Sequence, residues 1–351
     1  MTTNIPESFS CPMPIINHQT VQMAHGAGGK LSAELIEKFI LPRFANEALN
    51  RLEDQATLAL PAGKVAFSTD TFVVSPIFFP GGDIGDLAIN GTVNDLAMSG
   101  ATPLYLSVGF VLEEGFSLEA FHRVLISMEN AAKNAGVRVV TGDTKVVGKN
   151  SCDKIFINTS GIGVIAAGVS ISCKNLVPGD KILISGSLAE HGMAVMTKRE
   201  GLSFQSEILS DTAPLCKMVE KMLAATPEIH AMRDPTRGGL ATTLNEFAKS
   251  SQVGIKIYEE KVPVRDDVRG ACEMLGIDPL YVANEGKLVA AVPAEKADAV
   301  LAAMRADKFG EAACIVGEVT SSHTGMVVMQ TRLGANRIVD MPLGEQLPRI
   351  C

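Results

Sequence analysis

Tryptophan is absent from this chain of 351 residues, and tyrosine occurs only three times. No apolar run reaches the roughly 18 residues that a bilayer-spanning helix needs. Residues 1–22 lack a basic segment followed by an apolar core, so they do not predict a signal peptide. The net charge of −8 disfavours non-specific nucleic-acid binding, which depends on Lys and Arg contacts to phosphates. We therefore expect a cytoplasmic protein that binds neither nucleic acid nor membrane.

Several patterns that mark common catalytic and metal sites are also missing. The seven cysteines are odd in number and never spaced as CxxC, which argues against a disulfide framework or a structural zinc site. Free thiols are typical of a reducing compartment. The chain has no Walker-type P-loop and no GxSxG nucleophile elbow, so any ATP site is of another type.

The length and the order of the predicted elements indicate two domains with well-buried cores. Hairpin-capable strand pairs beside helices predict mixed sheets with helices on one face, not a doubly wound parallel sheet. The fold class is therefore α/β of the α+β type, with two domains built on mixed sheets with flanking helices. The expected segments are a flexible leader (1–20), an N-terminal domain (21–170), a C-terminal α/β domain (171–340) and a mobile tail (341–351).

Periodicity and capping residues place the individual elements. Helices are expected at 31–44, 83–99, 118–135, 188–200, 214–225, 238–250, 266–275 and 294–306. Strands are expected at 64–74, 104–113, 137–147, 154–167, 181–186, 253–258, 287–292, 313–319 and 325–331.

The chain ends in a cysteine, Cys351. Pro348 cannot donate a backbone hydrogen bond and biases Leu347 away from helix, which predicts an extended arm. From Gly344 onward such an arm could reach roughly 25 Å, at about 3.5 Å per residue. A thiol on this tether could travel between sites as a covalent carrier, or it could be part of a frayed end.

Acidic residues recur at predicted strand ends and turns, where sites are commonly built. Asn94 and Asp95 interrupt an apolar helical pattern, where a carboxylate is costly unless it binds a cation or is hydrogen-bonded. Oxygen ligands from separated loops suit Mg²⁺ that bridges nucleotide phosphates, although each aspartate alone could be a cap or a turn residue. The candidate set is Asp70, Asn94, Asp95, Asp143 and Asp234.

Glycine-rich turns and one Lys–Glu combination complete the candidates. Gly26, Gly28 and Gly29 precede a predicted helix and could cradle phosphate, although such glycines are more often plain turns. Lys145 and Glu285 could form a partly buried pair that moves protons, or a structural ion pair. Three histidines show no ligand spacing and are expected at the surface or in turns: His25, His191 and His230.

Four segments together resemble the HypE family of hydrogenase maturation proteins, within the superfamily of aminoimidazole-ribonucleotide synthetase and selenophosphate synthetase. They are STDTFVVSPIFFPGGDIGDLAINGTVNDLAMSGATP, VTGDTKVV, RDPTRGGL and ANEGKLV, and the terminal Pro-Arg-Ile-Cys completes the match. The likeness runs from His25 to Cys351, and the leader departs from it. It implies an aminoimidazole-ribonucleotide-synthetase-like fold whose N-terminal domain binds ATP and joins two copies, sheet to sheet, in a homodimer.

The resemblance also implies a reaction. A carbamoyltransferase, HypF, would load a carbamoyl group onto Cys351, and ATP-dependent dehydration would convert it to a thiocyanate. The cyanide would then pass to iron on a HypC–HypD scaffold for a nickel–iron hydrogenase. Lys145 and Glu285 would handle protons, and Mg²⁺ would lie on Asp70, Asp95, Asp143 and Asp234. Further nucleotide contacts would come from Gly26, Gly28, Gly29, Asn94, Thr144 and Asn245.

Two other functions fit parts of the pattern. A small-molecule synthetase of the same superfamily would phosphorylate a free acceptor. A selenophosphate synthetase should carry Cys or selenocysteine in the N-terminal glycine loop, where this chain has Ala27, and an aminoimidazole-ribonucleotide synthetase needs no terminal Cys. A non-enzymatic ATP-binding scaffold would use its tail only for docking.

Overall fold

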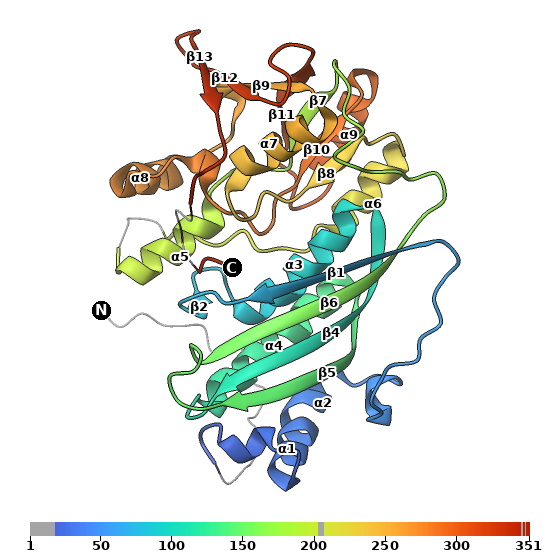
Figure 1. Ribbon diagram of the computed structural model, residues 1–351, viewed down its shortest axis with the longest axis vertical. Coiled ribbons are helices and arrows are strands. Elements are labelled where there is room, and N and C mark those ends of the chain that lie inside the picture. Colours follow the sequence, from blue (N-terminus) through green and yellow to red (C-terminus); the bar gives the residue numbers. More distant parts are fainter. Residues whose placement is uncertain (1–17, 203–206, 345–346, 348) are drawn as a thin grey trace.

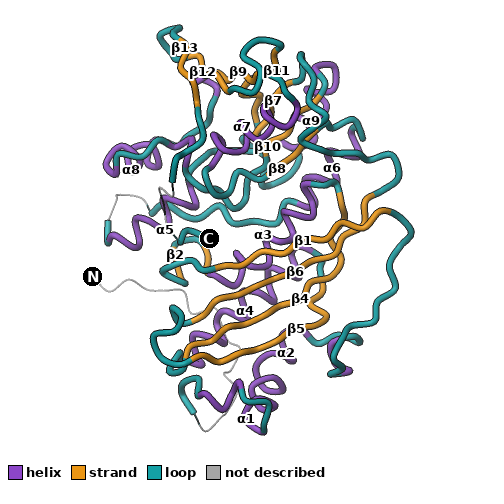
Figure 2. Tube along the Cα trace, in the orientation of Figure 1, coloured by secondary structure: helices purple, strands orange, loops and turns teal. Residues whose placement is uncertain are grey.

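The computed structural model describes residues 18–202, 207–344, 347 and 349–351. Most of the expected leader, 1–20, lies outside these residues. Figures 1 and 2 show two sheets, one in each half of the chain, with helices packed against them. None of the helices in the described part of the chain combines the length and apolar character that crossing a bilayer requires.

The first sheet has four strands in the order β1-β6-β4-β5, of which only β4 and β5 are parallel. Its strands are β1 (Lys64–Phe72), β4 (Ala101–Glu113), β5 (Arg138–Val147) and β6 (Ile155–Ile165). Helices α3 (Ile84–Met98) and α4 (Leu118–Ala135) cover one face, and Figure 1 looks onto the other. The uncovered face carries exposed apolar side chains, among them Val65 and Phe67, which are 52% and 70% exposed.

Capping and composition explain the two covering helices. The Asp83 carboxylate accepts the backbone N–H groups of Gly85 and Asp86 and thus caps α3. Nearly every residue of α3 is buried, because α3 packs on the sheet, on α4 and on elements of the second half. Ser117 caps α4, and Gly136 ends it in the left-handed conformation.

Before the first sheet, the helix expected at 31–44 is divided. The structure has α1 (Lys30–Leu35), a π-helical turn (Ile36–Ile40) and α2 (Leu41–Phe44). Pro42 has no backbone N–H, which removes one α-helical hydrogen bond at this point. A short hairpin, β2 (Phe78–Phe79) with β3 (Gly82–Asp83), leads into α3.

The second sheet has seven strands in the order β13-β12-β9-β11-β7-β10-β8 and is mixed, because β12 and β9 are parallel and the other pairs antiparallel. Its strands are β7 (Lys181–Ile184), β8 (Ala231–Arg233), β9 (Gly254–Tyr258), β10 (Val289–Val292), β11 (Cys314–Thr320), β12 (Val327–Gln330) and β13 (Asn336–Val339). The helices of this half are α5 (Glu190–Glu200), α6 (Cys216–Ala225), α7 (Gly239–Ser251), α8 (Asp266–Leu275) and α9 (Ala297–Arg305).

Helices cover both faces of this second sheet. Along β7, Ile182 and Ile184 join the cluster beneath α5, α7 and α8, while Leu183 joins the one beneath α6 and α9. The expectation of helices on one face thus holds for the first sheet and is wrong for the second. The predicted fold class, two mixed sheets with flanking helices, is confirmed.

Candidate active site

Four carboxylates from four parts of the chain converge where the two halves meet. Asp70 lies on β1, Asp95 on α3, Asp234 directly after β8, and Glu285 before β10. Each interacts electrostatically with at least one of the others, and Glu285 interacts with all three. We call these four residues the acidic cluster.

Burial and mutual repulsion raise the pKa values of this cluster. Desolvation is the largest cause of the raised pKa of Asp70 and of Asp95, whose carboxylate also accepts a 2.8 Å hydrogen bond from Ser68. Burial and then the Asp95 charge raise the pKa of Asp234 to about 7. Glu285 is only 3% exposed, and burial followed by the charges of Asp234 and Asp211 raises its pKa well above the ordinary value. A bound cation would offset this repulsion.

The oxygen donors of the acidic cluster are of the kind that Mg²⁺ prefers, but they do not form a complete binding site by themselves. The Oε1 atom of Glu285 is buried and has no hydrogen-bond partner. Within the described residues, no three His, Cys, Asp or Glu side chains are already arranged as a metal cage. Mg²⁺ usually keeps waters and binds through one or two carboxylates plus substrate phosphates, so the cluster fits an ion that enters with a nucleotide.

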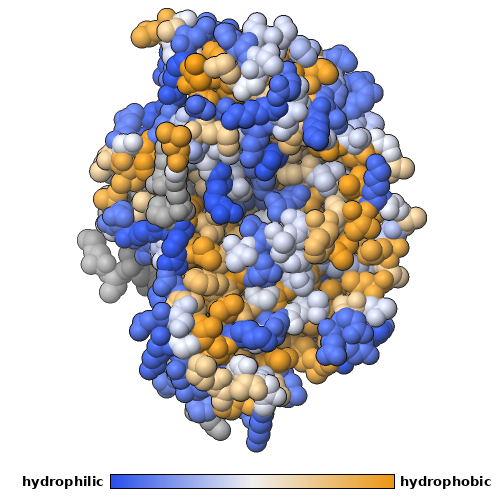
Figure 3. All heavy atoms as spheres, in the orientation of Figure 1, coloured by the Kyte–Doolittle hydropathy of each residue, from blue (hydrophilic) through white to orange (hydrophobic). Residues whose placement is uncertain are grey.

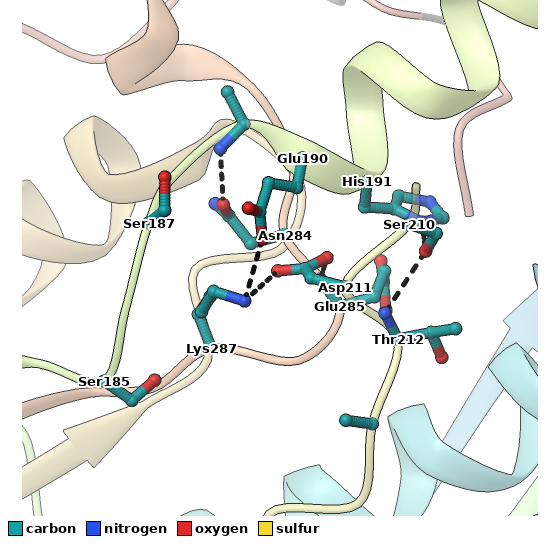
Figure 4. Close-up of polar contacts among 12 residues, drawn as sticks. Ser185, Ser187, Glu190, His191, Ser210, Asp211, Thr212, Asn284, Glu285 and Lys287 are labelled. Carbon is teal, nitrogen blue, oxygen red and sulfur yellow. Dashed lines mark hydrogen bonds and ion pairs between the residues drawn. The ribbon is translucent and has the colours of Figure 1, made fainter. Parts of the chain in front are cut away.

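The backbone of Glu285 is fixed by neighbours that the sequence reasoning missed. Asp211 accepts the Glu285 N–H at 3.1 Å and forms an ion pair with Lys287 at 3.1 Å. Lys287 also pairs with Glu190, at 3.2 Å (Figure 4). Burial opposes the ammonium charge, but these two carboxylates raise the pKa of Lys287 overall. The sequence feature that could have indicated this arrangement is Lys287, a charged residue at the start of an apolar strand.

Two of the predicted nucleotide contacts have structural partners instead. Asn94 donates to the carbonyls of Ala213 and Glu285 and accepts the Leu215 N–H, so both ends of its amide are occupied. Asn245 donates to the backbone carbonyls of Ala241 and Val339. Amides inside apolar helices need such partners when buried, and the sequence pattern alone does not distinguish this role from ligand binding.

Lys145 and Glu285 do not pair with each other within one copy of the chain. It lies on β5, with its side chain 65% exposed, and pairs with Asp143 at 2.9 Å. The hydrogen bond from Lys145 is the main cause of the lowered pKa of Asp143. The expected partly buried Lys145–Glu285 pair is therefore wrong for a single copy, because Lys145 lies on the β5 edge of the first sheet, whereas Glu285 precedes β10 and lies near Asp70 at the β1 edge.

The strand register gives the approximate distance between the two edges of the first sheet. Asp143 pairs with Gly109, which pairs with Asn158, which pairs with Thr71 on β1. Three strand spacings of about 4.8 Å place Asp143 roughly 14 Å from the β1 backbone beside Asp70. The structure thus divides the predicted magnesium set into Asp70, Asp95 and Asp234 at one edge and Asp143 at the other.

The N-terminal glycine loop lies against the β5 edge. A pocket of about 320 Å³ is lined by Gly26 and Gly28 together with Asp143, Thr144 and Lys145. A side chain at Gly26 would lie 2.6 Å from the backbone nitrogen of Val146, so only glycine allows this approach. Gly29 is the residue before α1 and has open space around it.

The C-terminal residues are docked between the two halves, beside the end of β1 (Figure 1). The Val73 N–H donates to the Cys351 carbonyl at 3.2 Å, and the Ser75 N–H donates to the Arg349 carbonyl at 3.1 Å. Ile350 is 2% exposed and belongs to the core beneath the first sheet. The described residues 349–351 of the expected extended arm are thus held by backbone hydrogen bonds without forming a strand, and Arg349 has a positive φ of 56°. The six cysteines of the described residues, Cys351 included, are unbridged.

The expected surface or turn position of His191 is wrong. Its side chain is fully buried and contacts the Ile350 carbonyl. It also contacts the Ser210 hydroxyl, which lies beside it in Figure 4. His25 is also buried, at 4% exposed, and His230 pairs with Asp180 at 2.7 Å. The absence of metal-ligand spacing says nothing about burial, which explains the error.

Comparison with known proteins gives a consistent result over the whole chain. The family model of the AIR synthase related protein, N-terminal domain, matches residues 52–165, and that of its C-terminal domain matches residues 177–330. Carbamoyl dehydratase HypE of Azotobacter vinelandii is 52% identical over 96% of this chain and 98% of its own length. Carbamoyl dehydratase HypE of Escherichia coli K12 is 45% identical over 94% and 99%.

Solved structures agree with these relatives. A crystal structure of hydrogenase maturation protein HypE in complex with ATP superposes with a TM-score of 0.91, at 50% identity, over 94% of this chain and 99% of that one. A chain of a HypE–HypF complex superposes with a TM-score of 0.78, at 51% identity, over 88% and 99%.

Proposed function

This chain belongs to the HypE family of hydrogenase maturation proteins, and we propose that it is an ATP-dependent dehydratase of a carbamoyl group carried on its own Cys351. The substrate is the S-carbamoyl cysteine, and the product is a protein thiocyanate. The cyanide so formed serves as a ligand for the iron of a nickel–iron hydrogenase. The relatives that cover nearly the whole chain are named for this activity.

The position of the terminal cysteine is the observation that carries the proposal. Cys351 is the last residue of the docked C-terminal segment, and its carbonyl accepts the N–H of Val73, three residues beyond Asp70. Through Ile350, His191 and Ser210, the same segment is connected to Asp211, which holds Glu285. A group on the Cys351 sulfur is thus delivered beside the acidic cluster without a diffusing substrate.

The chemistry needs phosphorylation because an amide oxygen is a poor leaving group. The carboxamide oxygen attacks the γ-phosphate of ATP, ADP leaves, and the nitrogen loses one proton. The C–O bond then breaks, phosphate leaves with the bonding electrons, and loss of the second proton gives the C≡N bond. The balance is S-carbamoyl cysteine plus ATP to thiocyanate, ADP, phosphate and a proton.

Glu285 and Lys145 are the proposed proton-transfer residues. Burial and neighbouring carboxylates raise the pKa of Glu285 well above its usual range, which suits a group that takes up a proton near neutral pH. The ammonium of Lys145 would hold phosphate charge or a departing proton beside Asp143. Mg²⁺ held by Asp70, Asp95, Asp143 and Asp234 would neutralise the phosphates, which leaves positioning and charge stabilisation as the main catalytic terms. The glycine loop and Thr144 would contact the nucleotide.

A homodimer would complete the site. The β5 edge of one copy lies roughly 14 Å from its own β1 edge, too far for Lys145 to reach Glu285. The uncovered face of the first sheet, with exposed Val65 and Phe67, offers the apolar surface for a second copy. Figure 3 shows hydrophobic patches on this face of the molecule. Joining two such faces would bring the partner's β5 edge towards the acidic cluster.

Other partners follow from the family. A solved complex pairs a HypE with HypF, and we assign the same carbamoyltransferase to this chain as the enzyme that loads Cys351. The HypC–HypD scaffold would receive the cyanide. These steps place the protein in the cytoplasm, where free thiols persist.

Intact-mass measurement after incubation with carbamoyl phosphate, ATP and the transferase tests the proposal. Wild-type protein should gain the mass of one carbamoyl group on the Cys351 peptide and then lose the mass of one water. Cys351→Ala should show neither change. A free small-molecule product with no adduct at Cys351 would instead support the small-molecule synthetase, and ATP binding without turnover would support the scaffold. The relatives do not favour either alternative.

A further inference from the structure

The buried imidazole of His191 connects the docked tail to the segment that holds Glu285. It lies at the start of α5, it is 0% exposed, and its ring packs edge-on against Phe79 with centroids 5.4 Å apart. Nothing in the proposed chemistry uses this side chain. Both of its nitrogens have partners, however, and the two partners belong to different parts of the site.

The partners fix the tautomer of His191. Its Nε2 lies 2.9 Å from the carbonyl oxygen of Ile350, which can only accept, so Nε2 carries the proton and donates. Its Nδ1 lies 2.8 Å from the Ser210 hydroxyl and accepts from it. The Ser210 oxygen in turn accepts the Thr212 N–H at 3.2 Å (Figure 4).

The segment from Ser210 to Thr212 is itself held tightly on both sides. A side chain at Gly81 would lie 2.6 Å from the backbone nitrogen of Ser210, which donates to the Pro80 carbonyl at 2.8 Å. A side chain at Gly286 would lie 1.7 Å from the Asp211 carbonyl oxygen. Backbones packed this closely move together, so a shift at Ser210 reaches the residue after Glu285.

We propose that His191 is a positioning residue that couples docking of the C-terminal tail to the placement of Glu285. With the tail docked, the Ile350 carbonyl fixes the imidazole, which orients Ser210 and holds Asp211 against the Glu285 N–H. With the tail withdrawn, for example at the carbamoyltransferase, the imidazole loses one of its two partners. The proton-transfer residue would thus be fixed only when its substrate is present. This inference rests on the proposed function.

Two substitutions test separately the contact of His191 with Ile350 and its contact with Ser210. The amide nitrogen of Gln can occupy the place of Nε2, so His191→Gln keeps the bond to Ile350. The shorter Asn places its amide near the position of Nδ1, so His191→Asn keeps the contact with Ser210 and loses the tail. Both remove the ring from Phe79 and therefore share any general packing loss.

The first measurement is the rate of Cys351 alkylation by iodoacetamide without nucleotide, read on the C-terminal peptide, with the Cys152 peptide as internal reference. Loss of one buried hydrogen bond should make the tail of His191→Asn react roughly fivefold faster, while His191→Gln should stay within about twofold of wild type. The Cys152 rate should be unchanged in both. Equal alkylation rates in the two variants would overturn the assignment.

The second measurement is single-turnover dehydration of protein already carbamoylated at Cys351. Each substitution breaks one half of the connection, so His191→Asn and His191→Gln should each lower the rate roughly tenfold, although only His191→Asn frees the tail. Ser210→Ala leaves the imidazole in place, so it should lower dehydration without changing the alkylation rate. If dehydration in Ser210→Ala equals that of wild type, the coupling is wrong even where the tail contact is right. If wild-type protein never gains a carbamoyl group, the proposed function fails, while the alkylation result still decides the role of His191 in docking.

Discussion

The two edges of the first sheet carry carboxylates in opposite physical states. At the β1 edge, Asp70 and its cluster neighbours are withdrawn from water, and burial raises their pKa values. At the β5 edge, the Asp143 side chain is 68% exposed, and Lys145 lowers its pKa. At the first edge the charges of Arg233 and Arg237 offset only part of the effect of burial, and the second edge offers an exposed ammonium group and a glycine loop. The two edges are therefore complementary, which favours a site made when two copies meet.

The largest expected effect comes from two variants, each of which removes the proton-transfer residue at one edge. Glu285→Gln and Lys145→Ala should each lower dehydration at least about 100-fold, because positioned proton transfer contributes that much or more. Subunits mixed in equal amounts and allowed to exchange should recover about a quarter of wild-type activity, because half of the dimers then contain one intact site of two.

The control is each variant by itself, taken through the same exchange procedure. It should stay inactive. Activity that never returns in the mixture, although mixed dimers form, would place both residues in separate sites and end the two-edge model.

A second prediction contrasts Asp95→Asn with Asp143→Asn. Asp95→Asn removes one charge from the repelling cluster and keeps an oxygen for the Ser68 hydroxyl. The nucleotide-free protein should therefore melt a few degrees higher, and Mg–ATP should stabilise it less than it stabilises wild type. Carbamoylation should continue while dehydration is lost. Asp143→Asn breaks only an exposed ion pair, which contributes about 0–1 kcal/mol, so its nucleotide-free melting temperature should hardly change.

Thermal melting with and without Mg–ATP measures both variants side by side. A nucleotide-free Asp95→Asn protein that melts below wild type would mean that the Asp95 charge is already compensated, and the assignment of the cation site would then be wrong.

A third prediction concerns the uncovered face between the two edges. Phe67 is 70% exposed on β1, and Phe67→Glu should convert a dimer into monomers in light scattering and lower activity with it. Met274, 68% exposed on α8 in the other half, provides the matched control. Met274→Glu should leave the assembly unchanged. Equal masses for the two variants would exclude the sheet face as the interface.

Most elements could be predicted from the sequence because their patterns are local. The helix expected at 83–99 corresponds to α3, and the strands of the first sheet fall within a few residues of their expected bounds. The short strands β8 and β13 have too few residues for a visible pattern. Helices on both faces of the second sheet follow from tertiary packing, since Leu183 and Ile184 are equally apolar in sequence and face opposite ways.

The site was less accessible to sequence reasoning. Asp70, Asp95 and Asp234 converge as expected, whereas Asp143 of the same expected set lies at the other edge, and Glu285, expected beside Lys145, takes its place. Asn94 was assigned to the nucleotide although backbone groups occupy its amide, and the role of Lys287 was not seen. Both omissions share a cause, because interaction partners that are distant in the sequence leave no local signal.

The smallest expected effect concerns histidine, and it compares the buried imidazole of His191 with an exposed one. Burial lowers the pKa of His191, while the Asp211 charge and the Ile350 carbonyl oppose this in part. The unfolded chain therefore binds a proton at higher pH than the native protein does, and stability is lost as the pH falls below the ordinary value of 6.5. His191→Gln has no such group, so its melting temperature should drop less than that of wild type between pH 7.5 and pH 5.5. His323→Gln replaces an exposed imidazole and should behave as wild type. A wild-type pH dependence retained in full by His191→Gln would assign the acid sensitivity to other residues.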